Sequence, residues 1–337
     1  MKEIYLVTGA AGFLGNVIVK KLLEQGKEVR ALVLSSFSMP FRDSHLTEFY
    51  GDVCQKESLI PFFSGLEEYD VFVIHCAGIV SISSHYDEKV YQVNVGGTKN
   101  VMDLCLEKQV KKVVHVSSVH AIPELSGEEV MREVSSFDKE KVVGLYAKTK
   151  AEASQYVLDQ AKKGLNVSIV HPSGIIGPGN YGHDHLSQMV IDYCNHRLTA
   201  IVKGGYDFVD VRDVADGILS CLKKGEKGEC YLLSNQYYEV EEIMYYLHEI
   251  THQKEIKTIL PFWFAKLTAP LSELYYKIQK EPPLYTSYSL YTLHSNAHFS
   301  HEKATQVLDY HPRDIKETLK DTVDWFVEQK VIAPYKS

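Results

Sequence analysis

Residues 8–15 read TGAAGFLG and separate two segments of different periodicity. The run before them, EIYLVT at 3–8, is typical of a β-strand, and the apolar residues after them recur at helical spacing. Glycines at such a junction permit a sharp turn, and the helix N-terminus offers free N–H groups to a diphosphate. The stretch therefore predicts a dinucleotide-binding loop. Its expected cofactor contacts are Thr8, Gly9, Gly12, Phe13, Leu14 and Gly15.

Short apolar runs alternate with helical patterns through the first half of the chain. The sequence predicts strands at 29–34, 71–75, 113–117 and 167–170 and helices at 90–107 and 146–163. Strands this short and this apolar are typical of a parallel sheet that helices cover on both faces. With right-handed crossovers the result is an α/β, doubly wound parallel-sheet Rossmann fold.

The second half is less regular and determines the predicted domains. A loop rich in Gly, Pro and His covers 171–185, and the tail beyond residue 254 is dense in aromatic residues and prolines. We expect an NAD(P)-binding Rossmann domain over 1–172, to which 207–235 returns. A smaller C-terminal substrate-binding lobe is expected over 173–337.

Composition excludes several classes of function. The 337 residues carry a formal charge of −8, so nucleic-acid binding is not expected. The six cysteines form no C-x-x-C pair and are typical of a reduced, cytoplasmic protein. No apolar run approaches the ~20 residues of a membrane helix, so no integral membrane segment is expected. The HDH cluster at 183–185 lacks a third partner at a convincing spacing, and no metal site is predicted.

The end of the second strand bears on the choice of cofactor. An acidic side chain there would hold the ribose diol of NAD, but residues 29–36 read VRALVLSS and contain no carboxylate. Ser35, Ser36 and Arg42 can instead meet a 2′-phosphate, which favours NADP over NAD. Asp52 has two equally weighted interpretations, a contact to the adenine and a helix cap.

Tyr146 and Lys150 stand four residues apart on a predicted helix, so their side chains share one face. A nearby cation favours the phenolate, which would allow Tyr146 to exchange a proton with a substrate oxygen near neutral pH. Ser117 and Ser118 end the preceding strand, where side chains face the ligand crevice of such folds. Ser118 is expected to hydrogen-bond the reacting oxygen, whereas Ser117 fits a structural role better.

Seven motifs occur in an order that resembles the extended short-chain dehydrogenase/reductase family, part of the NAD-dependent epimerase/dehydratase superfamily. They are TGAAGFLG (8–15), GDV (51–53), CAG (76–78), NVGGTKN (94–100), VSS (116–118), YAKTK (146–150) and FVDVRDVA (208–215). The resemblance implies that Tyr146 is the acid/base, that Lys150 holds the nicotinamide ribose and lowers the pKa of Tyr146, and that Ser118 orients the substrate oxygen. It also implies that Asn94 belongs to the catalytic set, as an asparagine that is more often structural or water-holding than chemical. Further implied cofactor contacts are Val53, Cys76, Ala77, Gly78, Ser117, Pro172 and Ser173.

Within this family the sequence favours one branch. The segment HPSGIIGPG at 171–179 lacks the R-x-x-N-x-Y-G-P pattern of sugar-nucleotide enzymes and resembles dihydroflavonol-4-reductase-like and 3β-hydroxysteroid-dehydrogenase-like proteins. The aromatic segments 260–278 and 282–293 fit an apolar pocket, although plain core packing explains them equally well.

The predicted function is an NAD(P)-dependent oxidoreductase that moves a hydride between nicotinamide and a secondary alcohol or ketone of a bulky, fairly apolar substrate. The alternative is a nucleotide-sugar epimerase or dehydratase with tightly bound NAD. A non-catalytic nucleotide sensor is disfavoured because both Tyr146 and Lys150 are present. The partner is a small molecule, and helices 90–107 and 146–163 allow a homodimer. Expected substrate contacts are Val80, Tyr86, His120, Tyr181 and His185.

Overall fold

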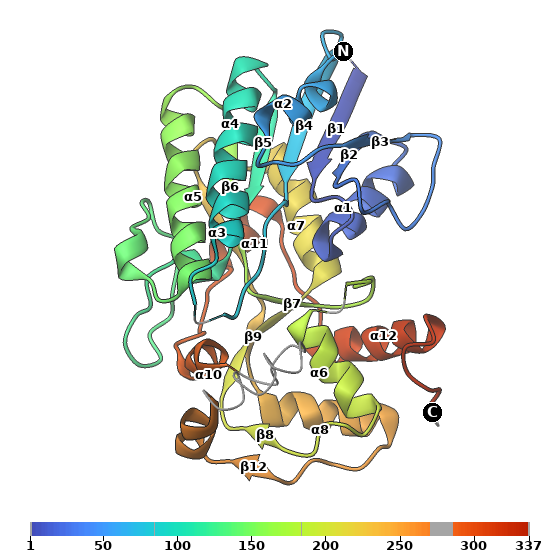
Figure 1. Cartoon of the computed structure of the whole chain (residues 1–337), viewed down its shortest axis with the longest axis vertical. Coiled ribbons are helices and arrows are strands. Elements are labelled where there is room, and N and C mark those ends of the chain that lie inside the picture. The colour runs from blue at the N-terminus through green and yellow to red at the C-terminus, as the bar shows by residue number, and fades with distance from the viewer. Residues whose placement is uncertain (1, 84, 183, 270–285, 336–337) are drawn as a thin grey trace.

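The computed structural model describes residues 2–83, 85–182, 184–269 and 286–335 and is built on a seven-stranded sheet. Every neighbouring pair of strands in this sheet is parallel. The predicted α/β Rossmann fold is confirmed (Figure 1). In spatial order the strands are β10 (Cys230–Leu233), β6 (Val167–Pro172), β5 (Lys112–Val116), β4 (Tyr69–His75), β1 (Lys2–Thr8), β2 (Glu28–Val33) and β3 (Leu46–Tyr50).

Helices cover both faces of the sheet because alternate strand residues are apolar on each side. On one face α1 (Phe13–Glu24) packs beside α7 (Val211–Lys224), over a core that includes Val7 and Ile74. On the other face α4 (Thr98–Glu107) packs beside α5 (Leu145–Lys162), over a core that includes Leu6 and Val73. The short helix α2 (Lys56–Leu59) packs near α4. This arrangement brings the carboxyl ends of β1, β4, β5 and β6 to one edge.

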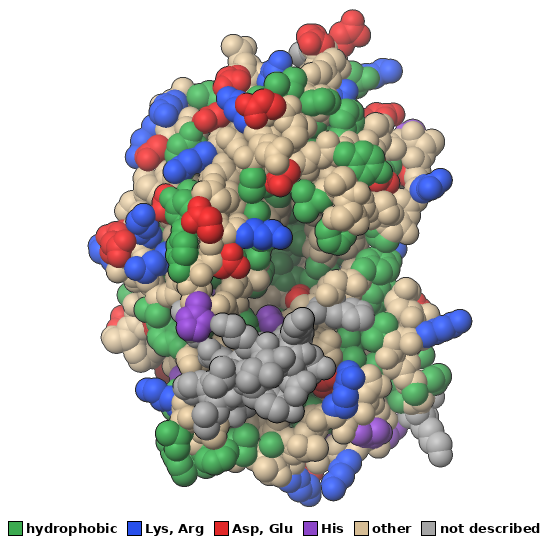
Figure 2. All heavy atoms as spheres, viewed as in Figure 1, with side chains coloured by type: hydrophobic (Ala, Val, Ile, Leu, Met, Phe, Trp, Pro, Cys, Tyr) green, Lys and Arg blue, Asp and Glu red, His purple; other side chains and the backbone are tan. Residues whose placement is uncertain are grey.

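A smaller lobe lies beyond that edge. Figure 1 shows it below the large sheet, and Figure 2 shows the surface hollowed between the two parts. A three-stranded sheet contains β7 (Gly174–Ile176), β9 (Gly205–Asp210) and β11 (Gln236–Glu239), and a two-stranded sheet contains β8 (Ile201–Val202) and β12 (Ile259–Leu260). Its helices include α6 (His185–Cys194), α8 (Val240–Thr251), α10 (Ser287–His294), α12 (Ile315–Glu328) and a helix over 262–269. The aromatic stretch 270–285 lies outside the described residues.

The chain crosses between the two parts more than once. Strand β10 joins the large sheet beside β6, whereas β9, which falls within the segment expected to return to it, pairs in the three-stranded sheet. Near the C-terminus, α11 (Glu302–Leu308) packs against α7 and β10 of the large domain.

The helix predicted over 90–107 is present, but it begins at Glu88 and contains a π-helical turn. The structure has α3 (Glu88–Tyr91), a π-helical turn (Gln92–Gly97) and then α4. The turn coincides with Gly96 and Gly97, and a Cβ on Gly97 would lie 2.6 Å from Val53 Cγ2. The close approach of the backbone to Val53 therefore requires a residue without a side chain at that point.

Several apolar residues of α4 and α5 pack into the core of the subunit. Val101, Met102 and Leu104 on α4 and Val157 and Leu158 on α5 are buried within the subunit. All six cysteines are free, and four of them are buried. Among the described residues, no helix is both long and apolar enough to cross a bilayer.

Candidate active site

The glycine loop has the shape that a diphosphate requires. Gly9 has φ +64°, and a Cβ built there would lie 2.7 Å from the Ala77 nitrogen. A Cβ on Gly15 would lie 2.1 Å from the Gly9 carbonyl oxygen, so the loop can pack on α1 only with glycine. Gly12 caps α1 without a side-chain hydrogen bond, and no acidic residue stands in its first turn. The free N–H groups and the helix dipole therefore suit a dinucleotide phosphate.

Side chains beside this loop hold it in place. Thr8 Oγ1 lies 2.7 Å from His75 Nδ1 and accepts a hydrogen bond from the Ala77 nitrogen at 3.3 Å. Cys76 and Ala77 are half-buried and Gly78 is exposed, so the loop after β4 borders the same edge as the glycines. Phe13 and Leu14 are half-buried at the start of α1.

The region expected to meet the adenosine carries no carboxylate between residues 29 and 42. Ser35, Ser36 and Arg42 are exposed in the segment after β2. The Arg30 guanidinium is not free to bind a 2′-phosphate, because it donates to the carbonyls of Phe62 and Ser64 at 3.0 and 2.7 Å.

The carboxylate of Asp52 closes a local turn. Its Oδ1 accepts a hydrogen bond from the Cys54 nitrogen at 2.9 Å, while α2 begins at Lys56. The backbone oxygen of the adjacent Val53 accepts from Asn100 Nδ2 at 2.9 Å, and the Val53 side chain packs on Gly97.

Tyr146 and Ser118 meet where α5 begins above the end of β5. Both side chains are buried, and the Ser118 hydroxyl hydrogen-bonds the Tyr146 hydroxyl. Ser118 also accepts a hydrogen bond from the His120 nitrogen at 3.3 Å, which orients it. The neighbouring Ser117 instead lies 2.7 Å, Oγ to Oγ, from Ser154 of α5 and serves packing.

Lys150 lies one turn along α5 from Tyr146. Its Nζ donates to the Val116 carbonyl at 3.0 Å and lies 6.0 Å from the centroid of the Tyr146 ring. A Cβ on Gly78 would lie 3.4 Å from that Nζ, so the loop after β4 reaches the ammonium group. Lys150 therefore faces the edge at which the glycine loop stands.

Burial determines the ionisation of both groups. It raises the pKa of Tyr146 to about 12, against the opposing effect of the Ser118 hydrogen bond. Burial lowers the pKa of Lys150 to about 8. Burial therefore dominates the pKa of Tyr146 in the chain alone.

Asn94 sits in the π-helical turn and makes three side-chain hydrogen bonds. Its Oδ1 accepts from the Ile79 nitrogen at 2.7 Å, and its Nδ2 donates to the Ile79 carbonyl at 3.0 Å and to Thr149 Oγ1 at 3.0 Å. It thereby ties the loop after β4 to α5, between Tyr146 and Lys150. This bonding is that of a structural residue.

Three aromatic side chains surround Tyr146 on the side of the smaller lobe. The His120 ring meets the Tyr146 ring edge-on at 5.8 Å between centroids, and Tyr206 stacks on His120 at 5.7 Å. Tyr288 of α10 lies at 6.3 Å from His120. His120 is a predicted residue and Tyr288 falls in the segment 282–293, but nothing in the sequence marks Tyr206, which comes from β9.

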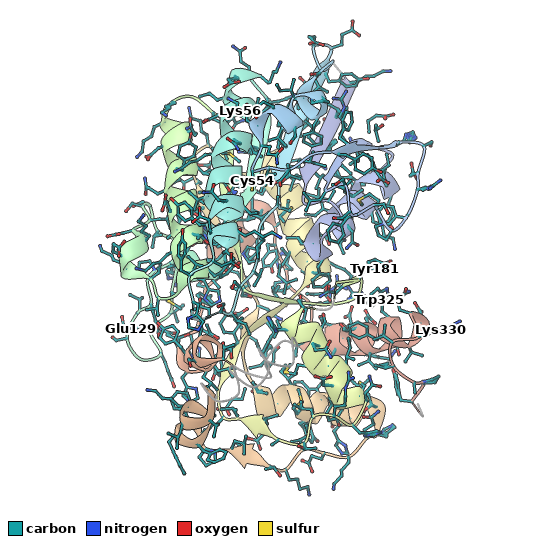
Figure 3. The ribbon with its side chains drawn as sticks, in the orientation of Figure 1. Cys54, Lys56, Glu129, Tyr181, Trp325 and Lys330 are labelled. Carbon is teal, nitrogen blue, oxygen red and sulfur yellow. The ribbon has the colours of Figure 1, made fainter. Side chains whose placement is uncertain are left out.

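The remaining predicted substrate residues are exposed, and two of them contact other side chains. Val80 is 68% exposed, and His185 is exposed at the start of α6. The Tyr86 hydroxyl donates to Glu88 at 2.7 Å. Tyr181 packs edge-on against Trp325 of α12, as Figure 3 shows. His183 lies outside the described residues, and within them no group of three or more potential ligands could hold a metal ion.

Pro172 and Ser173 leave the large sheet at the end of β6. The Ser173 hydroxyl donates to Asp207 Oδ1, which also accepts from the Asn235 nitrogen at 3.0 Å. Burial raises the pKa of Asp207 to about 7. The Ser173 side chain is thus engaged with the smaller lobe, and a cofactor contact would come from its backbone.

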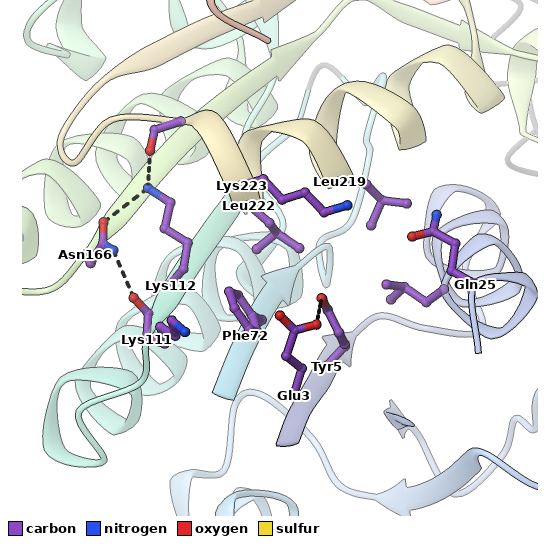
Figure 4. Close-up of a pocket in the computed structure, with 12 residues that line it drawn as sticks. Glu3, Tyr5, Gln25, Phe72, Lys111, Lys112, Asn166, Leu219, Leu222 and Lys223 are labelled. Carbon is purple, nitrogen blue, oxygen red and sulfur yellow. Dashed lines mark hydrogen bonds between the residues drawn. The ribbon is translucent and has the colours of Figure 1, made fainter. Parts of the chain in front are cut away.

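A separate cavity of about 370 Å³ opens at the opposite edge of the sheet, at the amino ends of the strands. Figure 4 shows its lining, in which Lys112 donates to Asn166 and to the Gly225 carbonyl, and Tyr5 donates to Glu3. Tyr146 and Lys150 do not line it.

Known proteins are similar to this chain both in sequence and in fold. Sterol demethylase protein B of Methylococcus capsulatus is 30% identical over 97% of this chain and 99% of its own length. A Synechocystis protein provisionally named as a dihydroflavonol 4-reductase is 28% identical over 97% of this chain and 95% of its own. The crystal structure of gox2253 matches with a TM-score of 0.84 at 28% identity, covering 98% of this chain and 100% of that one. The model of the NAD-dependent epimerase/dehydratase family matches residues 5–234, and the chain therefore belongs to that family.

Proposed function

We propose that this protein is an oxidoreductase that moves a hydride between NADP, in preference to NAD, and a secondary alcohol or ketone of a bulky, fairly apolar substrate. One observation carries the proposal: Tyr146, bonded by Ser118, faces side chains that are neutral at pH 7. Burial lowers the pKa of His120 to about 4 and raises that of Tyr206 well above its ordinary value. Among the described residues that meet Tyr146 on this side, none is Lys or Arg.

Neutral surroundings favour a neutral substrate. A sugar nucleotide brings a diphosphate, whose charge would need cationic partners if it were buried. A ketone on an apolar body loses little by leaving water and gains by burying its surface. The names of the relatives above, which refer to a sterol and a dihydroflavonol, are consistent with such a substrate.

The side chains supply the proton in the proposed reaction. The nicotinamide, when bound, supplies or accepts the hydride at the carbon of the alcohol or ketone. In reduction the carbonyl π-electrons move to its oxygen, and Tyr146 donates its proton there while Ser118 holds the same oxygen. The raised pKa keeps Tyr146 protonated at pH 7, which is the form that a reductase needs.

The cofactor preference rests on the segment after β2. The exposed Ser35, Ser36 and Arg42 offer donors to a 2′-phosphate, and no carboxylate between residues 29 and 42 repels it. We propose that Asp52, Gly78 and Pro172 also contact the cofactor and that Lys150 binds the nicotinamide ribose.

The test is NADPH or NADH oxidation, followed at 340 nm, with aryl ketones, ketosteroids and UDP-glucose. Steady consumption of NADPH with a ketone, lost in Tyr146→Phe, is the expected result. Conversion of UDP-glucose to its epimer without net cofactor consumption would overturn the proposal in favour of an epimerase. Activity retained by Tyr146→Phe would exclude the assigned proton donor.

A further inference from the structure

One tyrosine hydroxyl beside the proposed catalytic group has no hydrogen-bond partner within the part of the chain that the structure describes. The Tyr206 hydroxyl lies 2.9 Å from His120 Nε2, and Ser118 bonds the Tyr146 hydroxyl. The Tyr288 hydroxyl is buried and meets no partner among the residues that the structure describes. Burying a hydroxyl without a partner costs free energy, so such a group indicates where a bound molecule completes the bonding.

Tyr288 is presented by a helix that is anchored to the Rossmann domain at its N-cap and again at Tyr291. Thr286 caps α10 by accepting from the Ser289 nitrogen at 3.0 Å and donates to the Ile82 carbonyl at 2.8 Å. The Tyr291 hydroxyl donates to Glu124 at 2.6 Å. Ile82 follows β4 and Glu124 follows β5, so α10 is held against the two loops that border the site.

The Tyr288 ring is also packed against the start of the catalytic helix. Gly144, two residues before Tyr146, has φ +93°, and a Cβ built on it would lie 2.2 Å from a Tyr288 ring carbon. Only a glycine allows the ring to approach this closely. The position of Tyr288 relative to Tyr146 is therefore set by contact with the backbone, and the two hydroxyls interact electrostatically.

We propose that Tyr288 is a specificity-determining residue whose hydroxyl donates a hydrogen bond to a second, uncharged oxygen of the substrate, near the carbonyl oxygen that Tyr146 and Ser118 hold. This inference rests on the proposed function and refines its substrate class to ketones that carry a neighbouring hydroxyl or carbonyl oxygen. A charged group is disfavoured because Tyr206 and His120, which share this wall, are neutral. Burial raises the pKa of Tyr288 above its ordinary value, so the hydroxyl remains a donor.

Two ketones of nearly equal size separate this role from packing. In α-hydroxyacetophenone the carbonyl bears a CH₂OH group, and in propiophenone it bears an ethyl group. We expect the wild-type protein to prefer the hydroxyketone in kcat/KM, and Tyr288→Phe to lower kcat/KM for that ketone about tenfold. The kcat/KM for propiophenone should change less than about twofold, because this ketone has no second oxygen to accept the bond.

Tyr310→Phe is the matched control. Its hydroxyl is also buried without a partner among the described residues, but its ring packs on Gly217 of α7. In Tyr310→Phe the kcat/KM for both ketones should equal that of the wild type. Tyr288→Phe and Tyr310→Phe should both melt at or above the wild-type temperature, since each loses an unpaired polar group.

The outcomes distinguish a failure of the role of Tyr288 from a failure of the proposed function. Suppose that the wild-type protein reduces both ketones. If Tyr288→Phe then lowers kcat/KM equally for both ketones, or for neither of them, the role of Tyr288 is overturned while the proposed function stands. If the wild-type protein reduces no ketone of any kind, the proposed function fails and the role of Tyr288 fails with it.

Discussion

At the scale of single residues, burial rather than charge pairing controls the proposed catalytic groups. Tyr146 is 7% and Lys150 6% exposed, and each is driven toward its neutral form. A tyrosine and a lysine four apart on one helix face were predictable from the sequence. The direction in which their pKa values move was not, because it depends on how completely the two domains cover them.

Replacing Tyr146 by Phe should lower kcat by about 10²–10⁴-fold, which is the usual contribution of a positioned general acid. Binding of NADPH, measured by its fluorescence, should persist because the ring remains. Tyr156→Phe on the same helix removes a hydroxyl that bonds Asp103 on the outer face, and it should retain activity. Equal losses in the two variants would contradict the assignment.

Lys150 should make the stability of the cofactor-free protein depend on pH. Its folded pKa of about 8 lies below the ~10.4 of an unfolded lysine, so the unfolded chain binds more protons between these values. Stability from this group is therefore lowest below about pH 8 and rises toward pH 10. As the pH rises from about 7 to about 9.5, the melting temperature of the wild type should rise relative to that of Lys150→Met. Parallel curves would show that the lysine is not buried as described.

Arg42 should discriminate between the two cofactors. Loss of a charge-assisted bond to a phosphate removes about 1.5–3 kcal/mol, or roughly 10–100-fold in affinity. Arg42→Ala should therefore raise KM for NADPH about tenfold or more and leave KM for NADH unchanged. Lys20→Ala, an exposed lysine of α1, is the control. Equal changes for both cofactors would contradict the assignment.

At the scale of elements, glycines decide where backbone segments can approach. Gly9 and Gly15 let the loop fold onto α1, Gly97 lets the π-helical turn approach Val53, and Gly144 admits the ring of Tyr288. The first pair was recognisable because its spacing and its strand–helix setting are local. The other two depend on side chains that are distant in the sequence.

Gly15→Ala should abolish detectable NADPH binding, because its Cβ would lie 2.1 Å from the Gly9 carbonyl and force the loop off α1. Gly182→Ala, with ordinary van der Waals space around its Cβ, should bind as the wild type does. Fluorescence titration and circular dichroism together separate loss of binding from loss of the fold. Normal binding by Gly15→Ala would show that the loop does not form the site.

At the scale of the whole molecule, ion pairs of two partly buried arginines, Arg212 with Asp321 and Arg313 with Asp213, tie the C-terminal segment to α7. Asp210 caps α7 and pairs with Arg212 at 2.6 Å, and Asp213 pairs with Arg313 at 2.8 Å. The partner of Asp213 lies 100 residues away and was not identifiable from the sequence.

Arg313→Ala should lower the free energy of unfolding by about 3 kcal/mol, since it leaves the buried Asp213 carboxylate without its cationic partner, only the backbone N–H of residue 313 still donating to it. Lys320→Ala breaks an exposed pair with Asp324 on α12 and should cost less than about 1 kcal/mol. Urea denaturation measures both. Equal effects would show that Asp213 is as accessible to water as the surface pair.

The sequence by itself determined the fold and the core of the candidate site. The glycine loop, the alternation of strands and helices, and the spacing of Tyr146 and Lys150 are local patterns, and local patterns follow from backbone geometry. Only the tertiary structure placed Tyr206 and Tyr288 beside Tyr146, joined Asn94 to Ile79 and Thr149, and buried the apolar faces of α4 and α5 within the subunit. Those contacts join segments that are distant in the sequence; His120 and Tyr206, for example, lie 86 residues apart. They depend on the path of the whole chain, which no periodicity encodes.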